Sequence, residues 1–534
     1  MTTIGHPYTL PTTANVSFQE FLAPNTPHQR HVSDVTAFRG RLRIALKEHK
    51  HSSRHDFLNI QKAIEDYIPH ILGLLSALEV TELRVINEIE TTWRCTLSSP
   101  VHLSTKQPRV KHKSVYYEYV FTLLTLGYVY MDRANEYSQY AHNKILVAIG
   151  DVSNYTGGYG DGSSMTGTNV SYNSGSAVSS GIASGMAGSS SNSTGSTAKG
   201  SSSASSTASR LFKKKSSIIK GSATSNTIGE FTDYLTEEDL AGIDHQLTTA
   251  ADLYCKAAGI FEYVAQDLIP KWNESGLGAA GGSAKGAEAS RPIDVQISVV
   301  SAHIKVALGE AHACTVRKAS IKAARAAALR ASESSRSAGS GAAAATVSAA
   351  AGASKTSYVL LAKLSIGVKE EYERAYGLLK SVKDLNEISS DFRAHVKDAK
   401  VYYEALALTL LGMDAYESQQ YGKAVGFMTS AKASFAALIK SSKAGTIVSA
   451  ASFEYRLANE KCQAFQKIND SVTFEKVPST AELLTVMPSG RDLLKPKKYQ
   501  VPRPCFGPLS VDGSGAGGDE SVNKLAYALQ GAYF

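Results

Sequence analysis

Three groups of residues in this chain could do chemistry: a histidine cluster, a glycine motif and scattered cysteines. His49, His51 and His55 stand in KEHKHSSRHDF, where the last two are spaced i, i+4 and could share one face of a helix. Two imidazoles can hold a metal ion, but no clear third ligand lies nearby, and lysines and arginines are interspersed. We therefore interpret the cluster as a solvated basic segment between two helices.

Glycine supplies a second candidate. Gly513, Gly515 and Gly518 match the spacing GxGxxG, which binds a dinucleotide only where a strand precedes it and a βαβ unit surrounds it. No such pattern surrounds these glycines, so we interpret them as part of a flexible tail. The chain also has no HExxH, no P-loop and no kinase signature set. The sequence therefore predicts no catalytic residues, no metal and no cofactor.

The cysteines are odd in number and far apart, which predicts neither a disulfide framework nor a CxxC metal site. They are Cys95, Cys255, Cys314, Cys462 and Cys505. Cys255 and Cys314 lie in apolar helical patterns, where cysteine usually acts as a small hydrophobic residue. The first residues, MTTIGHPYTLPTT, have neither the basic nor the apolar region of a signal peptide. We expect a reducing compartment, most simply the cytosol.

Charge excludes one further class of protein. The chain has 56 Lys plus Arg against 48 Asp plus Glu, a formal charge of +8 over 534 residues, which is too dilute for a nucleic-acid binder. One local cluster stands out, because Lys213, Lys214 and Lys215 lie beside apolar residues in RLFKKKSSIIK (Arg210–Lys220). These lysines are candidates for contact with an anionic membrane surface. The alternative is a charge run in a disordered loop.

Composition divides the chain into regions. Thr156–Asn226 is a Gly/Ser/Thr tract that cannot bury enough apolar surface to offset its ordering entropy. Similar composition recurs at Asn273–Pro292 and Ala331–Ser357, and the chain turns Pro- and Gly-rich from Val477. We predict an N-terminal segment (1–32), one domain (33–476) with disordered insertions near 156–226, 273–292 and 331–357, and a C-terminal tail (477–534).

The globular regions have mainly helical periodicity, so the predicted fold class is mainly all-α. Val35, Phe38 and Leu42 recur at helical spacing behind Ser33–Asp34, which we predict as the N-cap. An apolar stripe from Leu240 to Val264 predicts a second helix that ends before Pro270. Further helices are predicted at 293–330, 358–382, 392–416, 421–440 and 448–470. Ile86–Leu97 and Val115–Tyr119 are predicted as two strands of a small hairpin.

One predicted helix pair resembles a tetratricopeptide unit. The positions typical of that repeat are taken by Leu408, Leu411, Gly412, Tyr421, Ala424, Met428 and Ala431. The small residues would let two antiparallel helices approach closely, while the larger ones fill the space between them. No second copy of equal quality is present, so this pair is predicted to be one element of a larger helical domain.

Several segments in chain order resemble the fungal pH-response regulator PalC family. They are YTLPTT near the start, WRCTLSS at Trp93–Ser99, SVYYEYVFTLLTLGYVYMDRA, YGKAVGFMTSAK, and MPSGR at Met487–Arg491. That family carries a BRO-one domain, the Alix-type helical domain. The resemblance implies an elongated, curved, mostly helical domain with tetratricopeptide-like hairpins and a small β-hairpin on its N-terminal side.

The resemblance also implies a function and partners. PalC-like proteins are non-enzymatic scaffolds that link an alkaline-pH receptor complex at the plasma membrane to ESCRT-III, with proteolytic activation of a PacC-type transcription factor as the output. The implied partners are the C-terminal amphipathic helix of the main ESCRT-III filament subunit and components of the pH-signalling complex. The chain would be cytoplasmic and recruited peripherally to the plasma membrane or the endosomal membrane. Two alternatives remain: a generic endosomal BRO-one cargo adaptor, and a hydrolase or metalloenzyme.

The resemblance further implies a binding patch. In the run YVLLAKLS, Leu360 and Leu364 fall on two aliphatic patch positions spaced i, i+4, and Asp244 in GIDHQL falls on an acidic position beside them. Helical periodicity places Leu360 about 100° from the centre of the helix's core stripe and Leu364 on its flank. The alternative is that both leucines belong to the core. Thr248 and Thr315 stand where the family has a lysine and a large aromatic residue, so affinity or partner preference is expected to differ.

Overall fold

Helices make up most of the folded chain, as the sequence predicts. The computed structural model describes residues 4–24, 26–52, 55–100, 107–148, 235–275, 291–337, 357–382, 384 and 387–507. The α-helices in these ranges are α1 (Gln29–His51), α2 (Phe57–Glu79), α3 (Val115–Ala148), α5 (Glu237–Tyr263), α6 (Ile269–Glu274), α8 (Ile297–Ser337), α9 (Tyr358–Lys380), α10 (Ser390–Glu417), α11 (Tyr421–Ser441), α12 (Gly445–Ile468) and α13 (Thr480–Thr485). Single turns of other helix types are η1 (Phe18–Phe21), η4 (Val264–Leu268), η5 (Ile293–Val295) and η8 (Asn469–Thr473).

Two helix ends differ from the prediction. α1 begins at Gln29 rather than behind Ser33–Asp34, because the apolar face of the helix continues back to Val32, which is 1% exposed. The helical course also continues past Val264 through a π-helical turn into α6, where Pro270 occupies the first turn. Proline is tolerated there, since the π-helical turn, in which Ile269 N donates to the carbonyl of Val264, already interrupts the regular i→i−4 hydrogen bonding.

The small antiparallel sheet is present, but one strand is not where the sequence placed it. β1 (Thr91–Arg94) lies within the predicted Ile86–Leu97 and pairs with β2 (Arg109–His112), with Trp93 opposite Val110. Val115–Tyr119, predicted as the second strand, forms the first turns of α3. Four of these five residues are aromatic or β-branched and have high β-propensity, but all five are buried, so tertiary packing decides their conformation.

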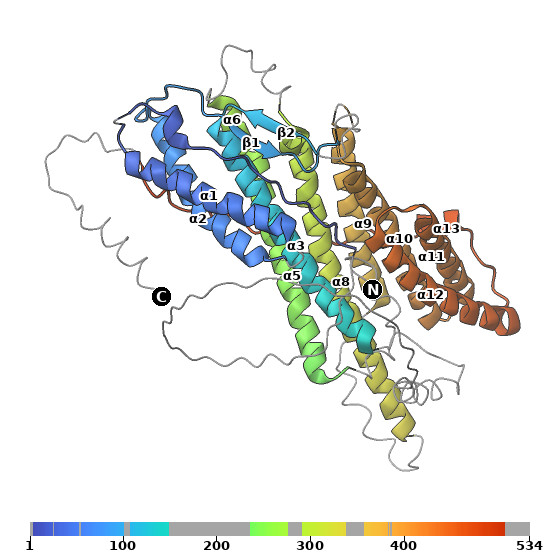
Figure 1. Cartoon of the computed structure of the whole chain (residues 1–534). Coiled ribbons are helices and arrows are strands. Elements are labelled where there is room, and N and C mark those ends of the chain that lie inside the picture. Colours follow the sequence, from blue (N-terminus) through green and yellow to red (C-terminus); the bar gives the residue numbers. More distant parts are fainter. Residues whose placement is uncertain are drawn as a thin grey trace, which may run out of the picture.

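The helices form an elongated row in which neighbours in the sequence are neighbours in space (Figure 1). Packing continues pair by pair from α1 and α2 through α3, α5, α8, α9 and α10 to α11 and α12. α10 and α11 form the predicted tetratricopeptide-like pair. A Cβ atom on Gly412 would lie 3.0 Å from Cε of Met428, so the two helices pack as closely as the sequence pattern requires.

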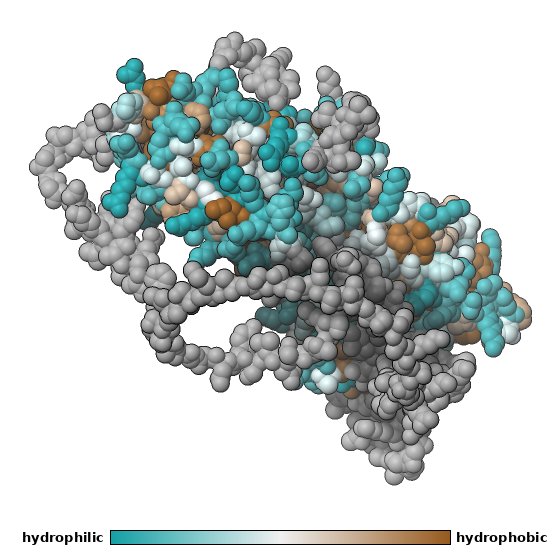
Figure 2. Space-filling view, in the orientation of Figure 1, coloured by the Kyte–Doolittle hydropathy of each residue, from teal (hydrophilic) through white to brown (hydrophobic). Residues whose placement is uncertain are grey.

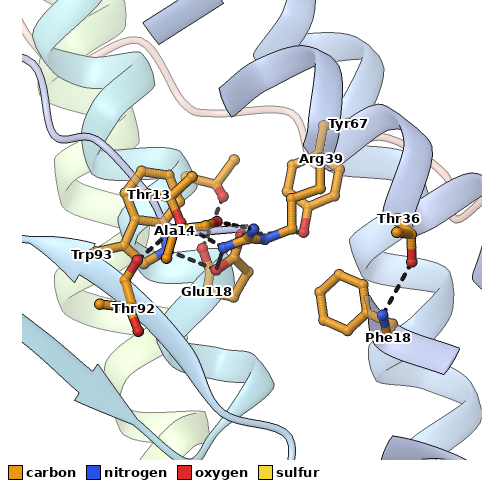
Figure 3. Close-up of polar contacts among 10 residues, drawn as sticks. Thr13, Ala14, Phe18, Thr36, Arg39, Tyr67, Thr92, Trp93 and Glu118 are labelled. Carbon is orange, nitrogen blue, oxygen red and sulfur yellow. Dashed lines mark hydrogen bonds and ion pairs between the residues drawn. The ribbon is translucent and has the colours of Figure 1, made fainter. Parts of the chain in front are cut away.

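A buried ion pair between Arg39 of α1 and Glu118 of α3 ties the N-terminal elements together (Figure 3). Nε of Arg39 donates to Oε1 of Glu118 at 2.8 Å, and Nε1 of Trp93 on β1 donates to Oε2 at 2.7 Å. Nη1 of Arg39 also donates to the carbonyl of Ala14 at 2.7 Å. Because both charges are fully hydrogen-bonded, the pair can be buried without an unsatisfied charge.

The described parts of both segments predicted to lie outside the domain, residues 4–24 and 26–32 and residues 477–507, pack against it. Near the start of the chain, Ile4 and Phe18 have no exposed surface, so the folded part begins well before residue 33. At the other end, residues 487–507, here called the strap, run across the row of helices. Its backbone N–H groups donate to α9, α8, α5 and α2 in turn: Arg491 to Lys363, Leu493 and Leu494 to His312, Lys497 to Cys255, and Cys505 to Pro69.

The predicted insertions overlap the helices only at their edges. α6 extends to Glu274 and α8 to Ser337, so each helix takes in the first residues of a predicted insertion. Most of the three insertions, including Lys213, Lys214 and Lys215, lies outside the described residues, as do Gly513, Gly515 and Gly518. The visible face of the folded part is mainly hydrophilic, with small separate apolar patches (Figure 2).

Candidate functional site

A groove lies between α5 and α8, which pack side by side (Figure 1). Its volume is about 710 Å³. The apolar residues that line it come from both helices: Leu240, Ala241, Ile243 and Leu247 from α5, and Ile321, Ala326 and Leu329 from α8. Leu329 is 47% exposed, so apolar surface in this groove is open to contact. An apolar groove of this kind can receive the apolar face of an amphipathic helix.

Ion pairs between α5 and α8 connect the two sides of the groove at one position along the helices. Nζ of Lys318 lies 2.8 Å from Oδ2 of Asp244, and Nζ of Lys322 lies 3.1 Å from Oδ1 of the same residue. Lys318 also donates to Oγ1 of Thr248 at 2.8 Å. Partial burial acts to raise the pKa of the Asp244 carboxyl, but hydrogen bonds from the two lysines outweigh it and lower the pKa below its ordinary value. Asp244 is therefore ionised at neutral pH and already paired within the chain.

The two leucines of the predicted patch differ in exposure. Leu360 is 37% exposed, whereas Leu364 is only 4% exposed. Leu364 lies on the inward face of α9 together with Leu361 and Val368, which follow the i, i+3, i+4 spacing of a core stripe. This corrects the expectation of an exposed pair: only Leu360 offers its side chain to a partner, and Leu364 packs in the core beneath it.

Leu360 lies at the level of the charged bridge. Ser98 donates to Asp294 just before α8 and forms a β-bridge with Ile388 just after α9, so the start of α8 lies near the end of α9 and the two helices run antiparallel. Tyr372 of α9 donates to Glu310 of α8. Leu360 is twelve residues before Tyr372, and Lys322 is twelve residues after Glu310. Because every residue of an α-helix adds the same rise, Leu360 and Lys322 lie at the same position along the axes of these two antiparallel helices. α8 thus has the Asp244 bridge on one side and Leu360 on the other.

Asp244 was predicted from the sequence as a residue of the binding patch, whereas Lys318 and Lys322 were not. The two lysines are spaced i, i+4 and could have been recognised as one charged face of a helix. The sequence does not show that this face meets Asp244, because that depends on the register between α5 and α8. Thr315, where the family has a large aromatic residue, lies one turn before Lys318, and its hydroxyl donates to the carbonyl of Ala311 at 3.3 Å.

The histidine cluster forms a packing contact in the structure. The rings of His49 and His55 lie 4.4 Å apart between centroids, and both pack near Phe57, whereas His51 is exposed at the end of α1. Burial, with a smaller contribution from His55, lowers the pKa of His49 to about 4. Within the described ranges, no three His, Cys, Asp or Glu side chains form a group that could hold a metal ion.

All five cysteines are free thiols, and four of them are buried. Burial raises the pKa of Cys255 and of Cys314 to about 11, so both remain protonated at neutral pH. These two residues act as small apolar side chains, as their helical patterns predict. Among the described helices, none has the length and apolar character that crossing a membrane requires.

A row of antiparallel helices with an apolar, charge-bridged groove defines the class of this protein, a helical binding domain. The BRO1-like domain family matches residues 235–504, which include α5, the groove, α9 and most of the strap. The chain belongs to the BRO1-like domain family.

Two relatives are similar in sequence over part of their length. The pH-response regulator protein palC of Emericella nidulans is 32% identical over 146 residues, covering 23% of this chain and 29% of that protein. The protein of the same name from Cryptococcus neoformans is 30% identical over 144 residues, covering 27% of each chain. The aligned stretch is thus less than a third of either relative.

One solved structure is similar over almost the whole chain. A crystal structure of ALIX in complex with the SIVmac239 PYKEVTEDL late domain has a TM-score of 0.51 and 12% sequence identity. The alignment covers 94% of this chain and 50% of that chain. This similarity supports the mainly helical, BRO1-type fold.

Proposed function

We propose that this protein is a non-enzymatic adaptor in ambient alkaline-pH signalling. It links a pH-sensing complex at the plasma membrane to ESCRT-III and is required for proteolytic activation of a PacC-type transcription factor. The observation that carries the proposal is the groove between α5 and α8, with Leu360 exposed at the level of the Asp244 bridge. The palC relatives, named as pH-response regulators, direct the proposal to this pathway.

The proposed ligand of the groove is the C-terminal amphipathic helix of the main ESCRT-III filament subunit. Its apolar face would cover Leu360 and the open part of the groove, whereas Leu364 would support Leu360 from the core. Asp244 would pair with a lysine or arginine of the partner, which must then compete with Lys318 and Lys322. A helix-in-groove interface of this kind concentrates its binding energy in a few aliphatic anchors.

A second candidate function is a generic endosomal cargo adaptor built on the same domain in ESCRT-dependent sorting. The same groove would serve either function, so location separates them. The pH-signalling adaptor is expected in the cytoplasm and at cortical plasma-membrane sites at alkaline pH. The cargo adaptor is expected on endosomes at any pH.

A deletion strain tests the proposed function directly. Cleavage of the transcription factor after a shift to alkaline medium is followed by immunoblot in wild-type cells, in the deletion strain, and in the deletion strain carrying Leu360→Asp. We expect loss of cleavage in the last two strains. Normal cleavage without the protein would rule out the proposed function.

A further inference from the structure

The strap carries a row of exposed positive charges. Arg491, Lys495, Lys497, Lys498 and Arg503 all have exposed side chains. The single acidic residue in this stretch, Asp492, lies 3.4 Å from Arg374 of α9, and Lys497 pairs with Asp252 of α5. The four other strap cations form no ion pair with any described residue. The strap therefore presents an excess of uncompensated positive charge.

The backbone of the strap is held in place. Arg491 N donates to the carbonyl of Lys363 at 3.1 Å, and Lys497 N donates to that of Cys255 at 2.9 Å. Farther along, Cys505 N donates to the carbonyl of Pro69 at 3.0 Å. An extended chain rises about 3.3 Å per residue, so the stretch from Arg491 to Arg503 can span up to about 40 Å. The cations are thus fixed along a line that crosses several helices.

Glycines in the helices beneath allow this close docking. A Cβ atom on Gly367 of α9 would lie 2.6 Å from the carbonyl oxygen of Arg491, and one on Gly259 of α5 would overlap the carbonyl of Lys497. Only a residue without a side chain permits the strap to approach so closely. The position of the charged row is therefore determined by contacts along its whole length.

Exposed apolar side chains lie among these charges. Leu493 is 44% exposed and Val501 is 43% exposed. Lysine and arginine with scattered aliphatic residues match the chemistry of an acidic lipid surface, where cations meet headgroups and apolar side chains enter the interface. An acidic peptide would satisfy the cations but would leave these two aliphatic side chains without a matching surface.

We propose that the strap is a peripheral contact surface for a bilayer containing anionic phospholipids. This inference extends the proposed adaptor function, because it names a folded surface that would hold the protein at a membrane. The membrane contact of the strap and the adaptor function of the groove can be contradicted independently. The strap is tested with protein-free vesicles, whereas the groove is tested with a helical peptide. The surface is also distinct from Lys213, Lys214 and Lys215, which lie outside the described residues.

The test uses the full chain and a matched pair of charge variants. In the strap variant, Arg491, Lys495, Lys498 and Arg503 are all changed to Gln. In the control, the same number of exposed lysines on α10, α11 and the loop after α11 are changed to Gln: Lys397, Lys423, Lys440 and Lys443. Circular dichroism and thermal melting check that both variants fold as the wild type does.

Co-sedimentation is measured with vesicles of phosphatidylcholine alone and with vesicles containing 30% phosphatidylserine, across a salt series. We expect binding only to the acidic vesicles, weakened by salt, and at least about tenfold weaker in the strap variant than in the control. Equal binding by strap variant and control would overturn the proposal, as would absence of binding by the wild type. If the strap variant binds vesicles as well as the control does but no longer binds poly-glutamate, the strap would instead be assigned to an acidic peptide.

Discussion

Nζ of Lys318 on α8 lies 2.8 Å from Oδ2 of Asp244 on α5, so the carboxylate proposed to meet a cationic partner already has a cation beside it. Lys322 lies on the other oxygen of the same carboxylate at 3.1 Å. A partner lysine or arginine must displace at least one of these contacts to reach Asp244. The two lysines should therefore reduce affinity for a basic helix and contribute to partner selection.

Changing Lys318 and Lys322 to Gln should strengthen binding of a partner helix that carries a basic residue at the Asp244 position. Exposed ion pairs contribute up to about 1 kcal/mol, so we expect an increase in affinity of roughly fivefold, measured by fluorescence anisotropy at low and at physiological salt. Lys397→Gln with Lys440→Gln serves as the charge-matched control. Weaker binding in the Lys318 and Lys322 variant would mean that these lysines contact the partner themselves.

Removing either charge of the Arg39–Glu118 pair should destabilise the N-terminal half strongly. Both side chains are at most 1% exposed, so Glu118→Gln or Arg39→Met leaves a buried charge without its partner, at a cost of about 3–5 kcal/mol. Denaturant unfolding of both single variants and of the double variant measures the effect. If the pair acts as one unit, the double variant loses less stability than the sum of the two single losses. Additive losses would contradict this coupling.

Gly259→Ala should loosen the strap. The added methyl group would overlap the carbonyl of Lys497, and overpacking of this kind typically costs about 1–3 kcal/mol. Hydrogen exchange at residues 491–505 is expected to speed up. Gly242→Ala on the same helix is the control, since nothing lies within 4 Å of a Cβ there. That control should be neutral or slightly stabilising. Identical exchange in the two variants would show that the strap does not depend on this contact.

Stability should fall on acidification because of two buried histidines. Burial lowers the pKa of His303 from 6.5 to about 3 and holds the pKa of His395 well below 6.5. The unfolded chain therefore binds protons below about pH 6.5 that the folded chain does not bind. The resulting stability is fully present above that pH and is lost as the pH falls towards the folded-state values.

The variant His395→Phe tests this pH dependence, because neither ring nitrogen of His395 has a hydrogen-bond partner and the residue is 1% exposed. Below pH 6, we expect the pH slope of the free energy of unfolding to decrease by about 1.4 kcal/mol per pH unit, which corresponds to one proton. Tyr8→Phe, which also alters a buried aromatic side chain, should leave the slope unchanged. An unchanged slope in His395→Phe would show that this histidine does not titrate as described.

The sequence was sufficient to predict helices where one face is apolar over several turns. Ile243, Leu247 and Ala250 on α5 are of this kind, and all three are buried. It was insufficient where propensity and packing disagree. Val115–Tyr119 has the composition of a strand, yet it forms part of α3, because burial on all sides favours continuation of the long helix.

The candidate site was predictable only in part. Asp244 and Leu360 were identified through the family resemblance, but the pairing of Asp244 with Lys318 depends on how α5 and α8 align in three dimensions. The packing of the strap on the helices could not be predicted from the sequence for a similar reason. Its composition is that of a tail, and its docking is seen only in three-dimensional contacts, such as the hydrogen bond from Lys497 to Cys255 and the close approach to Gly259 and Gly367.

We propose above that the surface containing Leu360 receives the C-terminal amphipathic helix of the ESCRT-III filament subunit. The most direct measurement is titration of that helix, fluorescently labelled, with the full chain and with Leu360→Asp. Leu58→Asp on α2, which changes a leucine that is 62% exposed, is the control, and Leu364→Asp should unfold because it buries a carboxylate. We expect saturable binding by the wild type and the Leu58 variant and at least about tenfold weaker binding by folded Leu360→Asp. Equal binding by wild type and folded Leu360→Asp, or no binding by the wild type, would contradict it.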